Sequence, residues 1–245
     1  MRNRTVRKFL IVVFWLALWQ VASIIVDNKI LLAGPYEALL SLFTLAKTGD
    51  FWLSIVYTLL KITGGFITGL ILGILFACLS YRFSLFREFI TPPVSVIKSI
   101  PVASFVILVI IWAGASSLSV IISALVVFPL IYLNVLSGLD STDRKLIETG
   151  SLFRMRFIDK ARYIYLPSVV PHLKSAVSMG CGMAFKSGIA AEVIGRPLQS
   201  LGAGIYLSKI SLATGDLFAW TFCAVVLSYL FEKVMSFIIR RILSE

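Results

Sequence analysis

The stretch DSTDRKLIETGSLFRMRFIDKARYIYLP, residues 140–167, is a polar interruption in a chain that is otherwise dominated by apolar runs. It is too polar to cross a membrane, yet apolar residues recur in it near helical spacing, at Leu146, Ile147, Phe153 and Phe157. That spacing predicts a short amphipathic helix. Such a helix between two apolar segments either lies on the membrane surface as a connector or docks against another protein, and the pattern alone leaves both open.

The composition around this loop is that of a membrane protein. Of the 245 residues, 59% are hydrophobic and 14% are charged, whereas a soluble domain carries about 25% charged residues. The basic amino terminus and its long apolar run favour an uncleaved first span over a signal peptide. We expect an all-α membrane protein, one transmembrane domain over 1–245, with six transmembrane helices at 9–26, 53–79, 85–112, 118–139, 168–194 and 217–239.

Basic residues are unevenly distributed between the connections. If the amino terminus is cytoplasmic, fifteen of the 23 lysines and arginines lie in inside segments and four lie in outside segments. Because cytoplasmic loops carry an excess of Lys and Arg, we expect both termini to be cytoplasmic. The asymmetry accounts for most of the net charge of +11, so no nucleic-acid partner is needed to explain it.

Two spans have unusual compositions. The third contains TPPVSVIKSIPVASF, in which Pro92, Pro93 and Pro101 are expected to interrupt the helix. Since hydrocarbon cannot replace the hydrogen bonds that proline removes, this broken segment should face protein or a water-filled cavity. The second span carries Gly65 and Gly73 among other small residues, which predicts close helix packing within the chain or at a subunit contact.

The charged residues Lys98, Lys186 and Glu192 are among those that lie within or near the ends of the apolar runs. A charge at the membrane centre costs roughly 2.5–3.5 kcal/mol on insertion scales, so these side chains should face a partner or an aqueous route. We expect an aqueous pathway near the proline break, with Lys98, Ser99, Pro101, Lys186 and Glu192 as its candidate residues. Structural ion pairs, or lysines that extend to the interface, remain the alternative.

The segment GCGMAFKSG, residues 180–188, approaches the phosphate-loop pattern G-x-x-x-x-G-K-[ST], but Phe185 replaces the second glycine. A phosphate-binding loop needs free backbone N–H groups at a helix start after a strand, and this segment lies within an apolar run. The three cysteines lie in apolar runs, and a single histidine cannot form a zinc site. We expect no nucleotide, metal or other cofactor on this chain and no enzymatic activity of its own.

The polar loop resembles the cytoplasmic signature of binding-protein-dependent ABC importer permeases. That signature runs E-A-A, then Gly six residues after the Glu, then L-P twelve residues beyond the Gly. Glu148 and the pair Leu166–Pro167 match it in register, and the small residues Thr149 and Gly150 replace the alanines. Arg154 stands at the glycine position, where glycine would ease the turn, so we expect this loop to turn differently.

The resemblance covers nearly the whole chain. The segments 32–45, 98–114, 162–195 and 217–233 are similar to permeases of the sulfonate/nitrate/taurine type. The resemblance implies a type I ABC importer permease-like bundle in the plasma membrane of a prokaryote. It also implies two ABC ATPase subunits that carry ATP and Mg²⁺, an extracytoplasmic solute-binding protein and a second permease copy in a homodimer. Sulfonates, nitrate, taurine and vitamin-precursor-like molecules all remain open as the solute.

In such a permease the loop helix would be the lever that docks on the ATPase. We expect Leu152 and Phe153 to be its apolar anchors, with charged residues at the rim, although simple cytoplasmic retention would also explain the arginines. The complete set of expected coupling residues is Ile147, Glu148, Thr149, Gly150, Leu152, Phe153, Arg154, Arg156, Leu166 and Pro167.

Three other classes are less compatible with the sequence. A secondary transporter also has broken helices but needs no helix-bearing loop that ends in L-P, and no convincing internal repeat is visible. A channel subunit would need a filter-like segment. A membrane-embedded enzyme would need paired acid and base groups or metal ligands, which a single His and scattered carboxylates do not provide.

Overall fold

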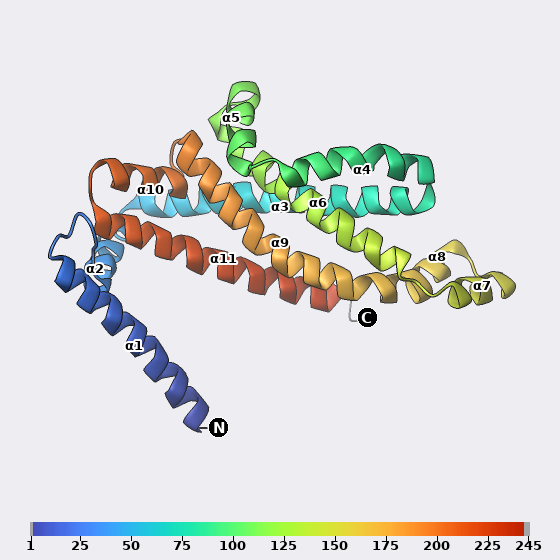
Figure 1. The fold of residues 1–245 in the computed structure, drawn as a ribbon, viewed down its shortest axis with the longest axis horizontal. Coiled ribbons are helices and arrows are strands. Elements are labelled where there is room, and N and C mark those ends of the chain that lie inside the picture. The colour runs from blue at the N-terminus through green and yellow to red at the C-terminus, as the bar shows by residue number, and fades with distance from the viewer. Residues whose placement is uncertain (1, 243–245) are drawn as a thin grey trace. The chain divides into compact units, whose positions relative to one another are not determined.

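The computed structural model describes residues 2–242, and that part of the chain is helical and contains no strand (Figure 1). A 3₁₀ turn at Ala115–Ser117 precedes α6, and a π-helical turn at Ala161–Tyr165 precedes α9. The helices are α1 (Arg2–Val26), α2 (Pro35–Leu45), α3 (Gly49–Arg82), α4 (Ser84–Ser99), α5 (Val102–Ala113), α6 (Leu118–Asp140), α7 (Arg144–Leu152), α8 (Phe157–Lys160), α9 (Leu166–Gly195), α10 (Leu201–Ile210) and α11 (Thr214–Ile242).

Five helical segments within the described residues are long and apolar enough to cross a membrane. They include α1, α3, α6, α9 and α11, and the bent pair α4–α5 would make a sixth span. The expected all-α membrane fold is therefore confirmed.

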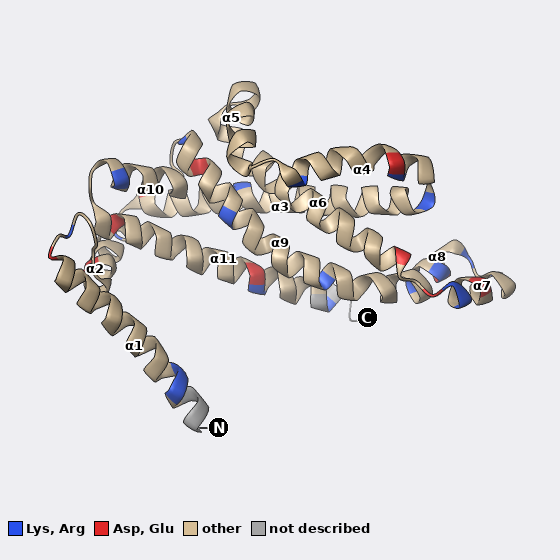
Figure 2. Cartoon of the chain, in the orientation of Figure 1, with Lys and Arg blue, Asp and Glu red and all other residues tan. Residues whose placement is uncertain are grey.

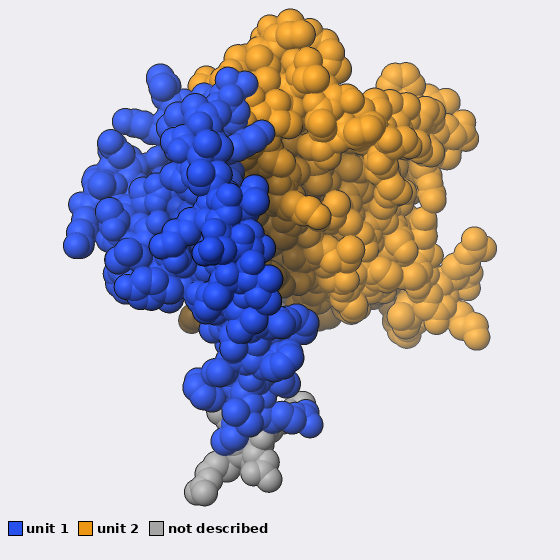
Figure 3. Space-filling view, turned by 60° about the vertical axis from the view of Figure 1, so that its left-hand side comes forward, with its two compact units in different colours: residues 1–58, 196–226 blue, residues 59–195, 227–245 orange. Residues whose placement is uncertain are grey.

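The chain divides into two compact units (Figure 3). The first consists of residues 1–58 and 196–226, and the second consists of residues 59–195 and 227–245.

Aromatic side chains organise the first unit. The Trp19 indole N–H donates to the Ala33 carbonyl at 3.1 Å, and the rings of Phe51 and Trp220 lie 4.9 Å apart. By contrast, no residue of α1 between 6 and 26 is buried within the chain. The chain itself therefore does not cover the apolar surface of α1.

The sequence around Gly34 starts α2 in two ways. Proline at the first helical position has its backbone already set for a helix, and Gly34 is the preceding cap. The Glu37 carboxylate accepts a hydrogen bond from the Gly34 N–H at 3.2 Å and pairs with Lys29 at 3.4 Å. A hydrogen bond from its own backbone N–H, and then Lys29, lower the pKa of the Glu37 carboxyl below its ordinary value. A charged carboxylate is favourable here because it faces the positive end of the helix dipole.

The second unit is built around α6 and α9, which pack along each other, with α3 against them. Phe66, Val127, Tyr132, Cys181 and Phe185 are among its fully buried side chains. The segment 180–188 lies inside α9, where Phe185 occupies the core. Its resemblance to a nucleotide loop therefore reflects residues that serve helix packing.

Glycines allow α3 to approach α6 closely. A Cβ added at Gly69 would lie 2.8 Å from the Ala124 carbonyl oxygen, and one at Gly73 would lie 2.7 Å from the Ile131 Cβ. Real Cβ atoms do not pack at such distances, so both positions require glycine for this packing. The close approach expected from the small residues is confirmed as an internal contact.

The break in the third apolar run falls at one proline rather than three. The helix α4 continues through Pro92 and Pro93, whereas α4 and α5 meet at a bend of 105° before Val102. Proline pushes the preceding residue out of the helical region, and Ile100 accordingly has an extended ψ of 132° before Pro101. The expectation that Pro92 and Pro93 interrupt the helix is wrong.

Candidate functional site

The loop between α6 and α9 forms a helix with a clear start. Asp143 is the N-cap of α7, and its carboxylate accepts a hydrogen bond from the Lys145 backbone N–H at 2.9 Å. The expected amphipathic helix thus exists. It begins at Arg144, three residues before Ile147, which is the first residue of the expected coupling set. Within α7, Ile147 is half-buried, whereas Glu148 and Thr149 are exposed.

The turn after α7 passes through Arg154. Its N–H donates to the Ser151 carbonyl at 3.0 Å, and the Met155 N–H donates to the Gly150 carbonyl at 2.9 Å. This bond pair closes a helix end when the intervening residue is left-handed, and Arg154 has φ of 50°. Arg154 therefore adopts the left-handed conformation that glycine would adopt most easily. The loop keeps the turn that a glycine would form at this position, contrary to the expectation that it turns differently.

Gly150 fixes α7 against the chain that follows. It is buried, and a Cβ there would lie 2.8 Å from the Ile164 Cδ1 and 3.3 Å from the Met155 sulfur. The Lys160 ammonium donates to the Ser151 hydroxyl at 2.9 Å and adds a second link. The loop helix is thus held against the π-helical turn that leads into Leu166 and Pro167, the exposed first residues of α9.

Apolar side chains are exposed at the tip of this loop. Leu152 is 82% exposed and Phe153 is 79% exposed, as docking anchors would be in a free subunit. Phe157 and Ile158, 80% and 75% exposed, extend the surface in the short helix α8. These two lay outside the expected coupling set, although the apolar spacing of the loop included Phe157. Basic residues lie around α7 and α8 (Figure 2). In the sequence, Arg154 and Arg156 follow Phe153 closely, and both are exposed.

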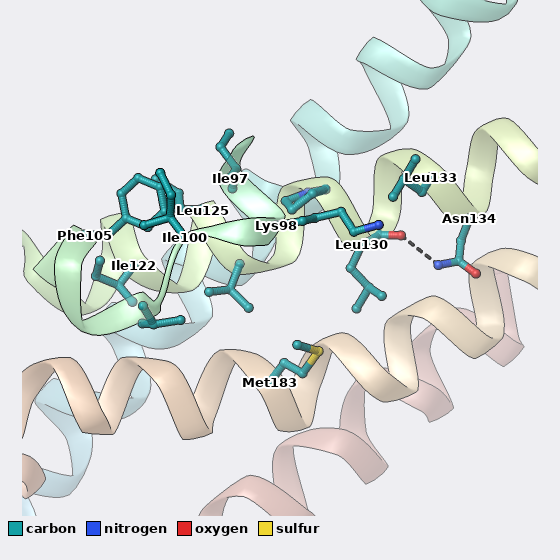
Figure 4. Close-up of a pocket in the computed structure, with 13 residues that line it drawn as sticks. Ile97, Lys98, Ile100, Phe105, Ile122, Leu125, Leu130, Leu133, Asn134 and Met183 are labelled. Atoms are coloured by element: carbon teal, nitrogen blue, oxygen red, sulfur yellow. Dashed lines mark hydrogen bonds between the residues drawn. The ribbon is translucent and has the colours of Figure 1, made fainter. Parts of the chain in front are cut away.

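A pocket of about 380 Å³ lies where the α4–α5 bend meets α6 and α9 (Figure 4). Its volume is within the range of roughly 300–1,000 Å³ that is typical of small-molecule sites. The walls are mostly apolar and include Phe105, Ile122, Leu130 and Met183. The bend at Pro101 forms this pocket because it turns α5 away from the axis of α4.

Two polar side chains enter this apolar pocket. Lys98 is the one charged residue among the described residues that line it, and Asn134 is the one amide. Asn134 donates to the Leu130 carbonyl at 2.8 Å, and in Figure 4 the Lys98 amine extends over Leu130 toward Asn134. The amide oxygen of Asn134 and the ammonium of Lys98 therefore offer one acceptor and one cationic donor to a bound molecule.

The other expected pathway residues lie in different environments. Ser99 donates its hydroxyl to the Ser95 carbonyl at 2.8 Å, and Pro101 marks the bend. Lys186 is exposed on α9 and does not line the pocket. Glu192 is completely buried and accepts a hydrogen bond from the Ser119 hydroxyl at 2.7 Å. Of the five expected pathway residues, Lys98 lines the pocket, and Glu192 is buried between α6 and α9.

Sequence reasoning missed Asn134. A signal was available, because this residue is a single amide inside an apolar run and stands five positions after Pro129. A polar side chain in a membrane segment needs a partner or an aqueous surface, as the charged residues do.

A family model and several known proteins are similar to this chain in sequence. The family model described as "Binding-protein-dependent transport system inner membrane component" matches residues 69–244. The putative aliphatic sulfonates transport permease protein SsuC of Bacillus subtilis is 22% identical, with 93% of this chain and 83% of that protein covered. The taurine transport system permease protein TauC of Escherichia coli is 21% identical, with 91% and 83% covered.

A third relative has a different printed solute. The riboflavin transport system permease protein RibX of Chloroflexus aurantiacus is 27% identical, with 92% of this chain and 86% of that protein covered. The helical fold, the matched family model and these relatives agree on one class. The chain belongs to the family of binding-protein-dependent transport system inner membrane components, the multi-pass plasma-membrane permeases of bacterial ABC importers.

Proposed function

We propose that this chain forms the solute pathway of an ATP-driven importer for small organic anions, such as sulfonates or taurine, or for nitrate or a vitamin-precursor-like solute. The observation that carries this assignment is the pocket at the α4–α5 bend, where Lys98 supplies a positive charge among apolar walls. An ammonium and an amide at one place favour a solute with an anionic or hydrogen-bonding head. The sulfonate, taurine and riboflavin relatives are compatible with that chemistry.

The proposed complex contains two copies of this permease, two cytoplasmic ATPase subunits that bind ATP and Mg²⁺, and an extracytoplasmic solute-binding protein. Both termini of the permease lie on the cytoplasmic side, with α7. ATP closes the ATPase pair and moves α7, and it drives transport only because it binds the closed pair more tightly than the open one. The helices α6 and α9 connect α7 to the pocket, since both line the pocket and they flank the loop on either side.

The coupling surface is tested with Phe153→Asp. An aromatic anchor at the centre of an interface often contributes about 2 kcal/mol or more, and a carboxylate there would also be desolvated. We expect the tagged wild-type chain, extracted gently from native membranes, to retain an ATPase subunit that the variant loses, with loss of ATP hydrolysis. Phe83→Asp is the matched control, because Phe83 is also exposed, at the α3–α4 turn. A chain that moves solute without any ATPase would overturn the proposal in favour of a secondary transporter.

The pocket is tested separately with Lys98→Gln in the reconstituted complex. We expect the solute concentration that half-saturates transport to rise about tenfold for an anionic solute, which corresponds to roughly 1.4 kcal/mol of lost charge-assisted contact. Lys209→Gln, which removes an exposed lysine of α10, is the control. An equal effect of both substitutions would show that general charge, rather than the pocket, attracts the solute.

A further inference from the structure

A second pocket, of about 460 Å³, lies between the first half of α9 and the last part of α11. It shares no lining residue with the pocket at the α4–α5 bend. Of the described residues that line it, five are polar or charged and three are apolar. The polar lining residues are Lys174, Ser178, Glu232, Lys233 and Ser236.

The polar groups of this pocket carry a net positive charge. The Ser178 hydroxyl donates to the Glu232 carboxylate at 2.6 Å, which occupies one carboxylate oxygen. The Lys233 ammonium lies 5.3 Å from the centre of the Tyr229 ring. Among the residues that the structure describes, no ion pair joins Lys174 or Lys233 to a carboxylate. Two ammonium groups and one carboxylate therefore leave about one positive charge unmatched in the pocket.

The two lysines lie at similar depths from one end of the helix pair. Lys174 follows the first residue of α9 by about 12 Å of helix, and Lys233 precedes the last residue of α11 by about 14 Å, at 1.5 Å per residue. Lysine side chains at such depths extend toward the membrane surface. The ammonium groups are thus within reach of the level of lipid headgroups, while Val177 and Phe237 line the same pocket with apolar surface.

We propose that this pocket binds the headgroup of an anionic glycerophospholipid. The phosphodiester would lie between the two ammonium groups and would match their excess charge, and the Ser236 hydroxyl adds a donor. Basic pockets between membrane helices recognise phospholipid headgroups in this way. The exposed apolar residues Val234 and Ile238 of α11 would contact the acyl chains.

The test uses the purified full-length chain in nonionic detergent and follows its thermal unfolding midpoint. The probes are dioctanoyl phosphatidylglycerol, dioctanoyl phosphatidylcholine and inorganic phosphate. We expect phosphatidylglycerol to raise the midpoint in a saturable manner, and the double variant Lys174→Gln/Lys233→Gln to need roughly tenfold more lipid or greater. The matched control is Lys47→Gln/Lys209→Gln, which removes the same charge from exposed positions and should respond like the wild type.

Four results of the lipid titration would overturn the proposal. They are an absent response of the wild type, an equal response to phosphatidylcholine, an equal response to inorganic phosphate, and an equal loss in both double variants. A double variant that no longer associates with a second permease copy but keeps its lipid response would assign the pocket to a subunit contact instead. Lys174→Arg/Lys233→Arg should retain the response, which separates lost charge from a folding defect.

Discussion

The backbone conformation of Arg154 is less favourable in free energy for a residue with a side chain than for glycine. Its φ of 50° lies in the left-handed region, where an L-residue loses roughly 1–2 kcal/mol relative to the helical region. Glycine avoids that cost but loses more conformational entropy on folding, about 0.5–1 kcal/mol. The arginine is therefore tolerated because the two hydrogen bonds that end α7 over-determine the turn.

We expect Arg154→Gly to stabilise the chain by about 0.5–1 kcal/mol, the difference between these two terms. The measurement is the thermal unfolding midpoint in detergent. Arg156→Gly is the control, because Arg156 has φ of −62° and ψ of 155°, where glycine relieves nothing and adds only entropy. A lower midpoint for Arg154→Gly than for Arg156→Gly would show that the turn is not under steric strain.

The burial of Lys186 and Glu192 could not be predicted from their spacing in the sequence. They are six positions apart on α9, so they do not share a face of a straight helix. Spacing alone does not say which of them is buried. The structure exposes Lys186 and buries Glu192 against Ser119, because α6 contacts one side of α9 and leaves another side open.

At the scale of helices, the packing of α3 on α6 can be tested with a single methyl group. In an exposed part of a helix, Gly→Ala is favourable by up to about 1 kcal/mol. At Gly73 the added Cβ would lie 2.7 Å from the Ile131 Cβ, and overpacking of this kind costs about 1–3 kcal/mol. We expect Gly73→Ala to lower the unfolding midpoint.

The matched control is Gly64→Ala on the same helix. A Cβ there meets nothing within 4 Å, so only the gain in helix propensity remains and the midpoint should rise. If both variants raised the midpoint equally, α3 and α6 would not be in close contact in solution.

The bend between α4 and α5 was partly predictable at the same scale. Three prolines predict that the helix is disturbed, but a membrane helix tolerates proline where the carbonyl groups that it leaves without a donor find other partners. Pro92 and Pro93 are exposed and α4 passes through them. The bend occurs at Pro101 because Ile100 has left the helical region, and that conformation could not be assigned from composition.

At the scale of the whole chain, the second unit contains both the proposed solute pocket and the proposed coupling helix α7. The pocket and α7 are joined through α6, which lines the pocket at Leu130 and ends at Asp140 just before the loop. The helix α9 makes the same connection on the other side, from Leu166 to Met183. A movement of α7 would reach the pocket through two packed helices, whose tight interior resists deformation.

The amino-acid sequence by itself determined the all-α membrane class, the membership of the permease family and the existence of a helix in the polar loop. These follow from local properties: the length of apolar runs, the register of Glu148 with Leu166–Pro167, and helical spacing. Only the tertiary structure decided that Asn134 joins Lys98, that Glu192 is buried, and that Phe157 and Ile158 extend the exposed tip. The reason is that burial and pocket lining depend on which helix faces pack together, and residues far apart in the chain set those contacts.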